Sequence, residues 1–380
     1  MAHKTKTLIV TDYFYPHWTG ISKSIFNLTQ SLQHKLDFTV LTVKYSNALK
    51  DQEKVGEVNI MRTSPLLSFS RAKVSLLLIL KFIKLVGNFD VIFINSPNAH
   101  ILPISFLTKI FGKKLVLFHQ GDLILPKGVM NRFIEKIFDL STLISFSFVN
   151  KVSTYTRDYA EHSRVLRPFL NKFTALLLPI YIPSVQRSSK DAITTKLQLL
   201  KNQRKILFGF GGRFVEEKGF DILFDAIPNI RKKLPNAHFV FAGETNMAYE
   251  NFFQKNVGKY NLVKRHITML GLLNSKELSK FYESIDFIVI PSRTDCFNMV
   301  QAEAMLSGKP SIVSDIPGAR YLVRQSAFGL TFQKENPADL ATKLVHAVKN
   351  KSFLLKNYPK LLEILDNKRN VEAIRKYLEE

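Results

Sequence analysis

The stretch KILFGFGGRFVEEKGFDIL, residues 205–223, decides the fold class of the second half of this chain. It opens with a short, continuous apolar run that ends at a Gly-Gly pair. Arg213 and Lys218 follow in a loop, and a helical pattern then occupies 219–233. A buried strand, a glycine turn and a helix in this order are typical of a parallel sheet covered by helices on both faces.

The same alternation extends in both directions along the chain. Apolar runs recur upstream in TLIV, FTVLTV, DVIFI and KLVLFHQ, and downstream in AHFVFAGE, HITMLG, DFIVIPS and KPSIVSD. A chain of 380 residues is long for one core, so two doubly wound α/β domains are predicted. We expect an amino-terminal Rossmann-like domain at 1–183, a polar connection at 184–204 and a carboxy-terminal Rossmann-like domain at 205–365. A last helix at about 366–380 should pack back across the connection between the two domains.

Composition narrows the class of protein and of partner. The chain has 54 Lys and Arg against 31 Asp and Glu, a net charge of +23, which is typical either of polyanionic or phosphorylated partners or of a solvated basic surface. It has no helix-turn-helix, zinc-finger or RNP signature, so we expect no nucleic-acid partner. Cys296 is its single cysteine, the amino terminus shows no cleavable leader, and the apolar run 75–87 is shorter than the roughly 20 residues of a membrane span. These features predict a cytoplasmic protein.

The loop after the 205–223 strand is a candidate anion site. Arg213 offers a planar fork of donors and Lys218 a point charge, a combination suited to a diphosphate whose leaving charge is neutralised without a metal. In the alternative interpretation Lys218 is a surface residue paired with Glu216 or Glu217.

A second candidate lies in PSRTDCFNMVQAEAMLSGKP, residues 291–310. Asp295 and Glu303 should border one cleft, and a helix is expected to begin near Met299, where free backbone N–H groups favour phosphate or sugar hydroxyls. On spacing alone, two carboxylates eight residues apart are commonplace. The donor-binding candidates of this half are Gly212, Arg213, Lys218, Phe297, Asn298, Met299, Val300 and Glu303.

The first half offers a loop from Asp12 to Gly20 and a histidine, His119, at the end of an apolar strand. Gly20 either admits a phosphate or only permits a tight turn, and His119 is either functional or a satisfied polar edge. The three spaced glycines of a dinucleotide fingerprint are missing, so NAD is not expected. The nine histidines and the carboxylates show no metal-binding spacing, so neither a metal nor a cofactor is predicted.

In their order along the chain, these segments resemble the retaining family 4 glycosyltransferases of the GT-B fold, most densely over 206–330. The resemblance implies two Rossmann-like domains facing each other across a cleft, and a UDP- or GDP-linked sugar as donor. It places the donor diphosphate on Arg213 and Lys218, the ribose hydroxyls on Glu303, a phosphate beside Gly20 and the transferred sugar beside His119. The catalytic candidates are therefore His119, Arg213, Lys218 and Asp295. The family usually has Glu at the position of Asp295, so the carboxylate that would hold the sugar is one methylene shorter here.

Two basic and apolar stretches lie in the first half, at 68–87 and 127–151. The first interleaves Arg71, Lys73, Lys81 and Lys84 with Leu, Ile and Phe. They predict reversible contact with an anionic membrane surface and a lipid-linked or glycan acceptor; the alternative is that both are ordinary core helices. Two other functions stay open, a sugar-nucleotide epimerase and a non-catalytic relative that binds sugar nucleotides or membranes.

Overall fold

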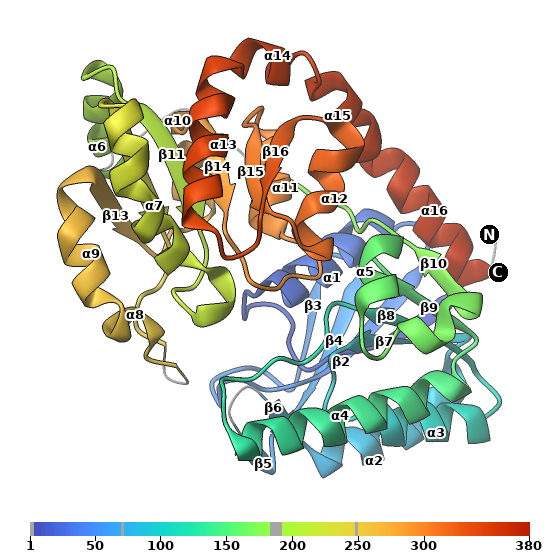
Figure 1. Cartoon of the computed structure of the whole chain (residues 1–380). Helices are drawn as coiled ribbons and strands as arrows, with labels where there is room; N and C mark the ends of the chain where they lie inside the picture. The colour runs from blue at the N-terminus through green and yellow to red at the C-terminus, as the bar shows by residue number, and fades with distance from the viewer. Residues whose placement is uncertain (1–3, 70–71, 183–191, 248–249) are drawn as a thin grey trace. The chain divides into compact units, whose positions relative to one another are not determined.

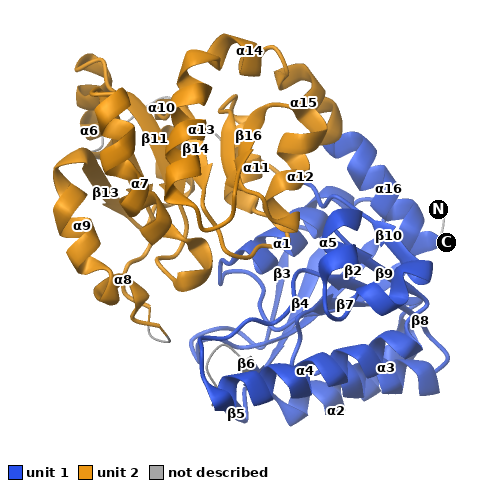
Figure 2. Cartoon of the chain, in the orientation of Figure 1, with its two compact units in different colours: residues 1–179, 366–380 blue, residues 180–365 orange. Residues whose placement is uncertain are grey.

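The computed structural model describes residues 4–69, 72–182, 192–247 and 250–380, so that Arg71 lies outside the described residues. The chain forms two compact units (Figure 2). Unit 1 comprises residues 1–179 and 366–380, and unit 2 comprises residues 180–365.

Unit 1 is built on an eight-stranded sheet in the order β10-β9-β8-β7-β1-β2-β4-β3 (Figure 1). All neighbouring strands are parallel except β3 and β4, which form an antiparallel pair. The central strands β1, β7 and β8 are buried almost throughout, as their continuous apolar runs predict. The strands are β1 (Lys6–Val10), β2 (Asp37–Val43), β3 (Gln52–Val55), β4 (Val58–Thr63), β7 (Val91–Ser96), β8 (Lys114–His119), β9 (Lys151–Thr154) and β10 (Phe173–Ala175).

Helices cover both faces of this sheet (Figure 1). One face carries α1 (Gly20–Leu32) and α5 (Arg157–His162). The other carries α2 (Leu76–Leu85), α3 (Ile101–Ile110) and α4 (Val129–Phe148), beside a hairpin of β5 (Leu67–Phe69) and β6 (Ala72–Val74). The carboxy-terminal helix α16 (Asn367–Glu379) belongs to this unit, where Glu372 accepts a 3.2 Å hydrogen bond from Lys35 on the loop after α1.

Unit 2 is built on six parallel strands in the order β13-β12-β11-β14-β15-β16. Phenylalanines form much of its core, with the ring of Phe208 stacked between Phe239 and Phe287 at centroid distances of 5.4 and 5.6 Å. The strands are β11 (Ile206–Gly211), β12 (Ala237–Ala242), β13 (Ile267–Gly271), β14 (Phe287–Ile290), β15 (Ser311–Ser314) and β16 (Gly329–Phe332). The helices are α6 (Ala192–Asn202), α7 (Phe220–Lys233), α8 (Phe252–Lys255), α9 (Val257–Val263), α10 (Ser275–Ser284), α11 (Met299–Leu306), α12 (Pro317–Ser326), α13 (Pro337–Lys349), α14 (Lys351–Leu355) and α15 (Tyr358–Ile364).

The polar stretch at 184–204 is only in part a connection. Its second half is helix α6, which packs on α10 and β11 and buries Leu197 completely. Lys201 at the end of α6 donates a 3.2 Å hydrogen bond to the carbonyl of Glu283. A sequence whose composition is typical of a linker therefore forms a helix of unit 2, which packs through the buried side chain of Leu197. The remainder of the predicted connection, 183–191, lies outside the described residues.

In the basic and apolar stretch at 68–87, the helix begins only at Leu76. Ser75 caps it by accepting a 3.3 Å hydrogen bond from the amide of Leu78, while residues 72–74 form strand β6. Across the parts of the chain that the structure describes, no helix combines the length and the apolarity that crossing a bilayer requires.

A buried histidine in unit 2 makes stability depend on pH. His238 in β12 is 9 % exposed, and its Nε2 lies 2.9 Å from Thr268 Oγ1. Burial, followed by nearby cations such as Lys205, lowers the pKa of His238 from 6.5 to about 4. Between these values the unfolded chain binds a proton that the folded chain excludes, so acidification from pH 6.5 toward 4 should lower the free energy of unfolding by about 3 kcal/mol.

We expect His238→Gln, which keeps a group able to reach Thr268, to remove this contribution. Urea denaturation at pH 7 and at pH 4.5 would show it as a smaller loss of stability in the variant than in the parent. His346→Gln on the exposed side of α13 is the matched control and should leave the pH dependence unchanged. Equal losses in the parent and in His238→Gln would contradict the assignment.

Candidate functional site

The loop that follows β11 is shaped by glycine. The amide of Gly212 donates a 2.9 Å hydrogen bond to the carbonyl of Ala242. Gly219, which ends the loop, has φ of +64°, and a Cβ at this position would lie 2.0 Å from the carbonyl oxygen of Pro291. Only glycine fits there, and this close approach brings the 213–218 loop against the segment that follows β14.

Lys218 meets that segment through a buried ion pair. Its Nζ donates to Asp295 Oδ1 at 2.8 Å, and the two side chains are only 18 % and 10 % exposed. Burial is the largest single influence and lowers the pKa of Lys218, but the carboxylates of Asp295 and Glu217 outweigh it and raise the pKa above its ordinary value. Lys218 is therefore a firmly charged ammonium at neutral pH.

Arg213 is the first residue of the same loop. Its Nη2 donates to Glu217 Oε1 at 2.7 Å, and its side chain is 41 % exposed. The ion-pair partner of Lys218 is thus Asp295, and the carboxylate expected in the alternative interpretation, Glu217, pairs with Arg213 instead. The positive charge of Arg213 lies close enough to offset part of the rise in the pKa of Lys218, so two cations lie near each other in this loop.

The start of α11 lies next to this loop. Asn298 donates from Nδ2 to Asp295 Oδ2 at 2.8 Å, and its Oδ1 caps the helix by accepting a 2.9 Å hydrogen bond from the amide of Gln301. A Cβ on Gly211, the last residue of β11, would lie 2.7 Å from Val300 Cγ1, so the strand end and the helix start touch. The amides of Met299 and Val300 precede the capped amide and have no helical carbonyl to bond, which favours an anion here.

Phe297 and Glu303 are two further buried candidates in this cluster. Phe297 is 8 % exposed in the loop before α11. Glu303 is 2 % exposed on the second turn of α11 and accepts a 2.7 Å hydrogen bond from the hydroxyl of Tyr282. Burial, and next the charge of Glu303, raises the pKa of Tyr282 well above its ordinary value, so the hydroxyl stays protonated and donates to the carboxylate. The orientation of Glu303 is therefore fixed from α10.

The sequence gives no signal of the pair that fixes the loop, Arg293 and Asp221. The guanidinium of Arg293 donates to both oxygens of Asp221, at 2.9 and 2.8 Å, and to the carbonyl of Glu216 at 2.8 Å. The carboxylate of Asp221 is the largest cause that raises the pKa of Arg293 above its ordinary value. The two residues are 72 positions apart, and their contact ties the first turn of α7 to the loop after β14.

Gly20 and His119 belong to unit 1, whereas the other candidate residues belong to unit 2. His119 ends β8, is 1 % exposed, and has Nε2 at 3.0 Å from Asp122 Oδ1 and Nδ1 at 3.0 Å from Ser96 Oγ. Burial is the largest influence on Asp122 and raises its pKa, but hydrogen bonds from His119, Ser163 and the amide of Arg164 outweigh burial and lower that pKa. The ionised carboxylate accepts from Nε2–H, so a sugar hydroxyl would have to displace a protein partner of this imidazole.

Gly20 is the exposed first residue of α1. Thr19 and Ser22 cap the helix reciprocally, with amide to side-chain distances of 3.1 and 2.8 Å. Gln120, which follows His119, accepts a 2.8 Å hydrogen bond from Ser24 and donates to the carbonyl of Ile21 at 3.3 Å. The first turn of α1 and the end of β8 therefore form one cluster within unit 1.

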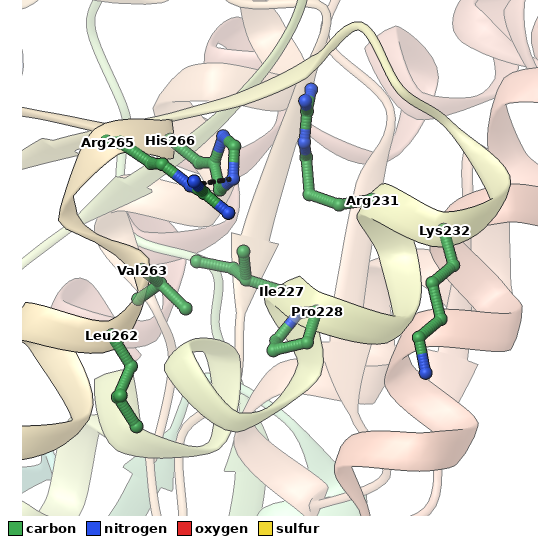
Figure 3. A pocket seen from close by; sticks show the side chains of 8 residues that line it. All are labelled: Ile227, Pro228, Arg231, Lys232, Leu262, Val263, Arg265 and His266. Carbon is green, nitrogen blue, oxygen red and sulfur yellow. Dashed lines mark hydrogen bonds between the residues drawn. The ribbon is translucent and has the colours of Figure 1, made fainter.

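One surface pocket lies apart from these residues. It has a volume of about 540 Å³ and occupies the end of α7 and the segment before β13 (Figure 3). Its cationic lining includes Arg231, Lys232 and Arg265, and no candidate site residue lines it. Within the described residues, we find no group of three or more His, Cys, Asp and Glu side chains placed to hold a metal ion.

Residues 191–365 match the sequence family described as glycosyl transferases group 1. Most of unit 2 is therefore similar to the glycosyl transferases group 1 domain. An uncharacterized glycosyltransferase of Methanocaldococcus jannaschii is 36 % identical over 157 residues, which are 41 % of this chain and 42 % of that protein. The chain thus spans about two fifths of the length of this relative.

The relation to known proteins extends beyond the group 1 domain. A phosphatidyl-myo-inositol mannosyltransferase of Mycobacterium leprae is 24 % identical over 70 % of this chain and 65 % of that protein. Among solved structures, a trehalose-6-phosphate protein from E. coli bound with UDP-2-fluoro glucose superposes with a TM-score of 0.76 at 14 % identity, over 99 % of each chain. Together with the two sheets, one parallel and one parallel except for the β3–β4 pair, this likeness confirms the predicted GT-B fold class.

Proposed function

We propose that the chain is a glycosyltransferase that moves a sugar from a nucleotide-diphosphate sugar to an acceptor. The observation that carries the proposal is the buried Lys218–Asp295 pair, which holds a charged ammonium beside the start of α11 within the stretch that is similar to a group 1 domain. The relatives named above are glycosyltransferases, and the E. coli structure holds a UDP-sugar analogue. Both facts support a nucleotide sugar as the donor, and we propose that it is UDP- or GDP-linked.

The chemistry assigned to this cluster is stabilisation of the leaving group. As the bond between the sugar C1 and the diphosphate oxygen breaks, negative charge gathers on the diphosphate. Lys218, Arg213 and the first amides of α11 neutralise that charge, so the proposed reaction needs neither a metal nor another cofactor. Asp295 holds Lys218 and Asn298 in place, and its contact with the sugar would be made from this position.

We further propose that the reaction retains the anomeric configuration. The acceptor hydroxyl attacks C1 on the face that the diphosphate leaves, the new C1–O bond forms there, and the acceptor proton passes to a diphosphate oxygen. Glu303 would bind the ribose hydroxyls with an orientation set by Tyr282, His119 would lie beside the transferred sugar, and Gly20 would admit a phosphate.

The acceptor is proposed to be lipid-linked or a glycan. The M. leprae relative supports a lipid, since its name gives a phosphatidylinositol acceptor and a mannosyl group. A cytoplasmic protein that attaches peripherally to the inner face of a membrane would meet such a lipid, and we propose that location for this chain.

Donor binding and product analysis test this function together. UDP and GDP, with and without magnesium, would be screened for thermal stabilisation, and each matching sugar nucleotide would then be incubated with lipid and glycan acceptors. We expect one nucleotide to stabilise the protein without magnesium, and the NMR spectrum of the product to show the anomeric configuration of the donor. An epimerised donor formed without acceptor would indicate an epimerase. Binding without turnover, persisting in Asp295→Glu, would indicate a non-catalytic relative.

A further inference from the structure

Exposed apolar side chains are concentrated on one helical layer of unit 1. Of the 27 large hydrophobic residues that are exposed in the described parts of the chain, 16 lie between residues 66 and 144. This stretch holds 79 of the 380 residues, about a fifth of the chain. They come from α2, α3, α4 and the segments beside them: Leu66, Leu67, Leu76, Leu77, Leu80, Ile83, Phe106, Ile110, Phe111, Ile124, Val129, Met130, Phe133, Ile137, Leu140 and Ile144.

Helix α4 shows that this apolar surface is organised. Its exposed residues Met130, Phe133, Ile137, Leu140 and Ile144 recur at intervals of three and four, so they form one stripe along the 20-residue helix. The opposite side of the same helix is the one that is buried, through residues such as Phe146. Such a stripe normally faces a core, and here it faces outward.

The neighbouring helices continue the stripe into a surface. Helix α2 follows the hairpin of β5 and β6, α3 follows β7 and α4 follows β8, and the three helices lie on the same face of the sheet (Figure 1). Phe106 of α3 meets Phe148 of α4 edge to face, with ring centroids 6.1 Å apart. On α2, Leu76, Leu80 and Ile83 share the outward face with the exposed Lys84, which is one turn beyond Leu80.

The charges around this surface have one predominant sign. Between residues 64 and 113 the chain has six Lys and Arg and a single acid, Asp90. On α4 the exposed Arg132 and Lys136 flank the apolar stripe, while the two acids of the helix are engaged: Glu135 accepts from the amide of Leu125 at 2.6 Å, and Asp139 accepts from Arg164 at 2.7 and 3.2 Å. The surface is thus apolar with basic flanks.

We infer that the outward faces of α2, α3 and α4 form a docking surface for an anionic lipid bilayer. The apolar side chains enter the interface between headgroups and acyl chains, and the lysines and arginines contact lipid phosphates. A second copy of this chain would offer the same positive charge, and like charges would then face each other, so charge complementarity favours the bilayer. The inference extends the proposed function, because a bilayer is where a lipid-linked acceptor lies.

Vesicle flotation tests the surface without donor or acceptor, so its outcome is independent of glycosyl transfer. We expect the full chain to float with phosphatidylcholine vesicles that contain roughly 30 mol% phosphatidylglycerol, and to bind pure phosphatidylcholine about tenfold more weakly. Added salt should weaken the part of the binding that depends on anionic lipid, because it screens the charges. Nucleotide binding, measured on the same samples without vesicles, reports separately on the proposed function.

Two triple variants and a matched control identify the face. Serine replaces Met130, Phe133 and Ile137 in one variant and Leu76, Leu77 and Leu80 in the other, all exposed positions whose loss should spare the fold. Each variant should partition into the anionic vesicles at least about tenfold more weakly than the parent. The control carries serine at Leu262, Leu272 and Phe353, which are 81 %, 77 % and 65 % exposed in unit 2, and should float as the parent does. Failure of the parent to float, equal flotation of all variants, or a solution dimer that the α2 and α4 variants dissociate would each overturn the inference.

Discussion

Replacing Lys218 by alanine is expected to lower kcat/KM for the nucleotide-sugar donor by about two to three orders of magnitude. The buried ammonium is held beside the start of α11 by a 2.8 Å contact with Asp295, where the proposed leaving diphosphate gathers its charge. Steady-state kinetics with the donor found in the nucleotide screen would measure the loss. Lys218→Arg keeps a cation at this position and should lose less.

The control for this variant is Lys259→Ala. Lys259 is also paired with an aspartate of unit 2, Asp225, but the two side chains are 42 % and 39 % exposed. Its removal should leave kcat/KM within about twofold of the parent value, because exposed ion pairs contribute little to stability. Because Lys218→Ala also leaves the buried Asp295 without its cation, urea denaturation of the variant is needed to separate a folding defect from a catalytic one. A folded Lys218→Ala enzyme with nearly unchanged kcat/KM would contradict the assigned role.

Arg293→Ala should be the most destabilising change near the site. It leaves Asp221, whose side chain is 8 % exposed, as a buried carboxylate without its two hydrogen bonds from the guanidinium. Loss of one partner of a buried pair costs about 3 kcal/mol. We expect a loss of this size in urea denaturation of unit 2. Donor binding should also weaken, because Arg293 holds the carbonyl of Glu216 in the 213–218 loop.

Arg324→Ala is the matched control for Arg293→Ala. Arg324 also donates to both oxygens of an aspartate, Asp315, at 2.8 and 3.0 Å, but its side chain is 51 % exposed. Its loss should change the free energy of unfolding by less than about 1 kcal/mol and leave nucleotide binding unchanged. Similar effects of the two substitutions would show that the Arg293–Asp221 contact does not fix the loop.

Much of the fold could be predicted because its strands are buried on both faces. KLVLFHQ and AHFVFAGE form β8 and β12 within a residue or two of the expected bounds. Weaker patterns carried no such signal: the hairpin of β3 and β4 is half exposed, and α6 is a polar helix held by one buried leucine. In both cases tertiary packing, rather than a local run, decides the structure.

The candidate site was predicted where its members lie close along the chain. The Gly-Gly loop and the start of α11 each follow a strand, so the carboxyl edge of a parallel sheet brings them together. Contacts between distant residues were not predictable: Tyr282 orients Glu303 from another helix, and the partner of Lys218 is 77 positions away. A single sequence holds no record of such pairs.

A crystal structure with the nucleoside diphosphate selected by the thermal screen would show whether the two cations after β11 bind the donor diphosphate. We expect phosphate oxygens within hydrogen-bonding distance, about 3 Å, of Lys218 Nζ and the guanidinium of Arg213, with the ribose toward Glu303. The proposed role of the two cations would be contradicted by a diphosphate bound elsewhere while Lys218 contacts only Asp295. One such place is the pocket of Arg231, Lys232 and Arg265.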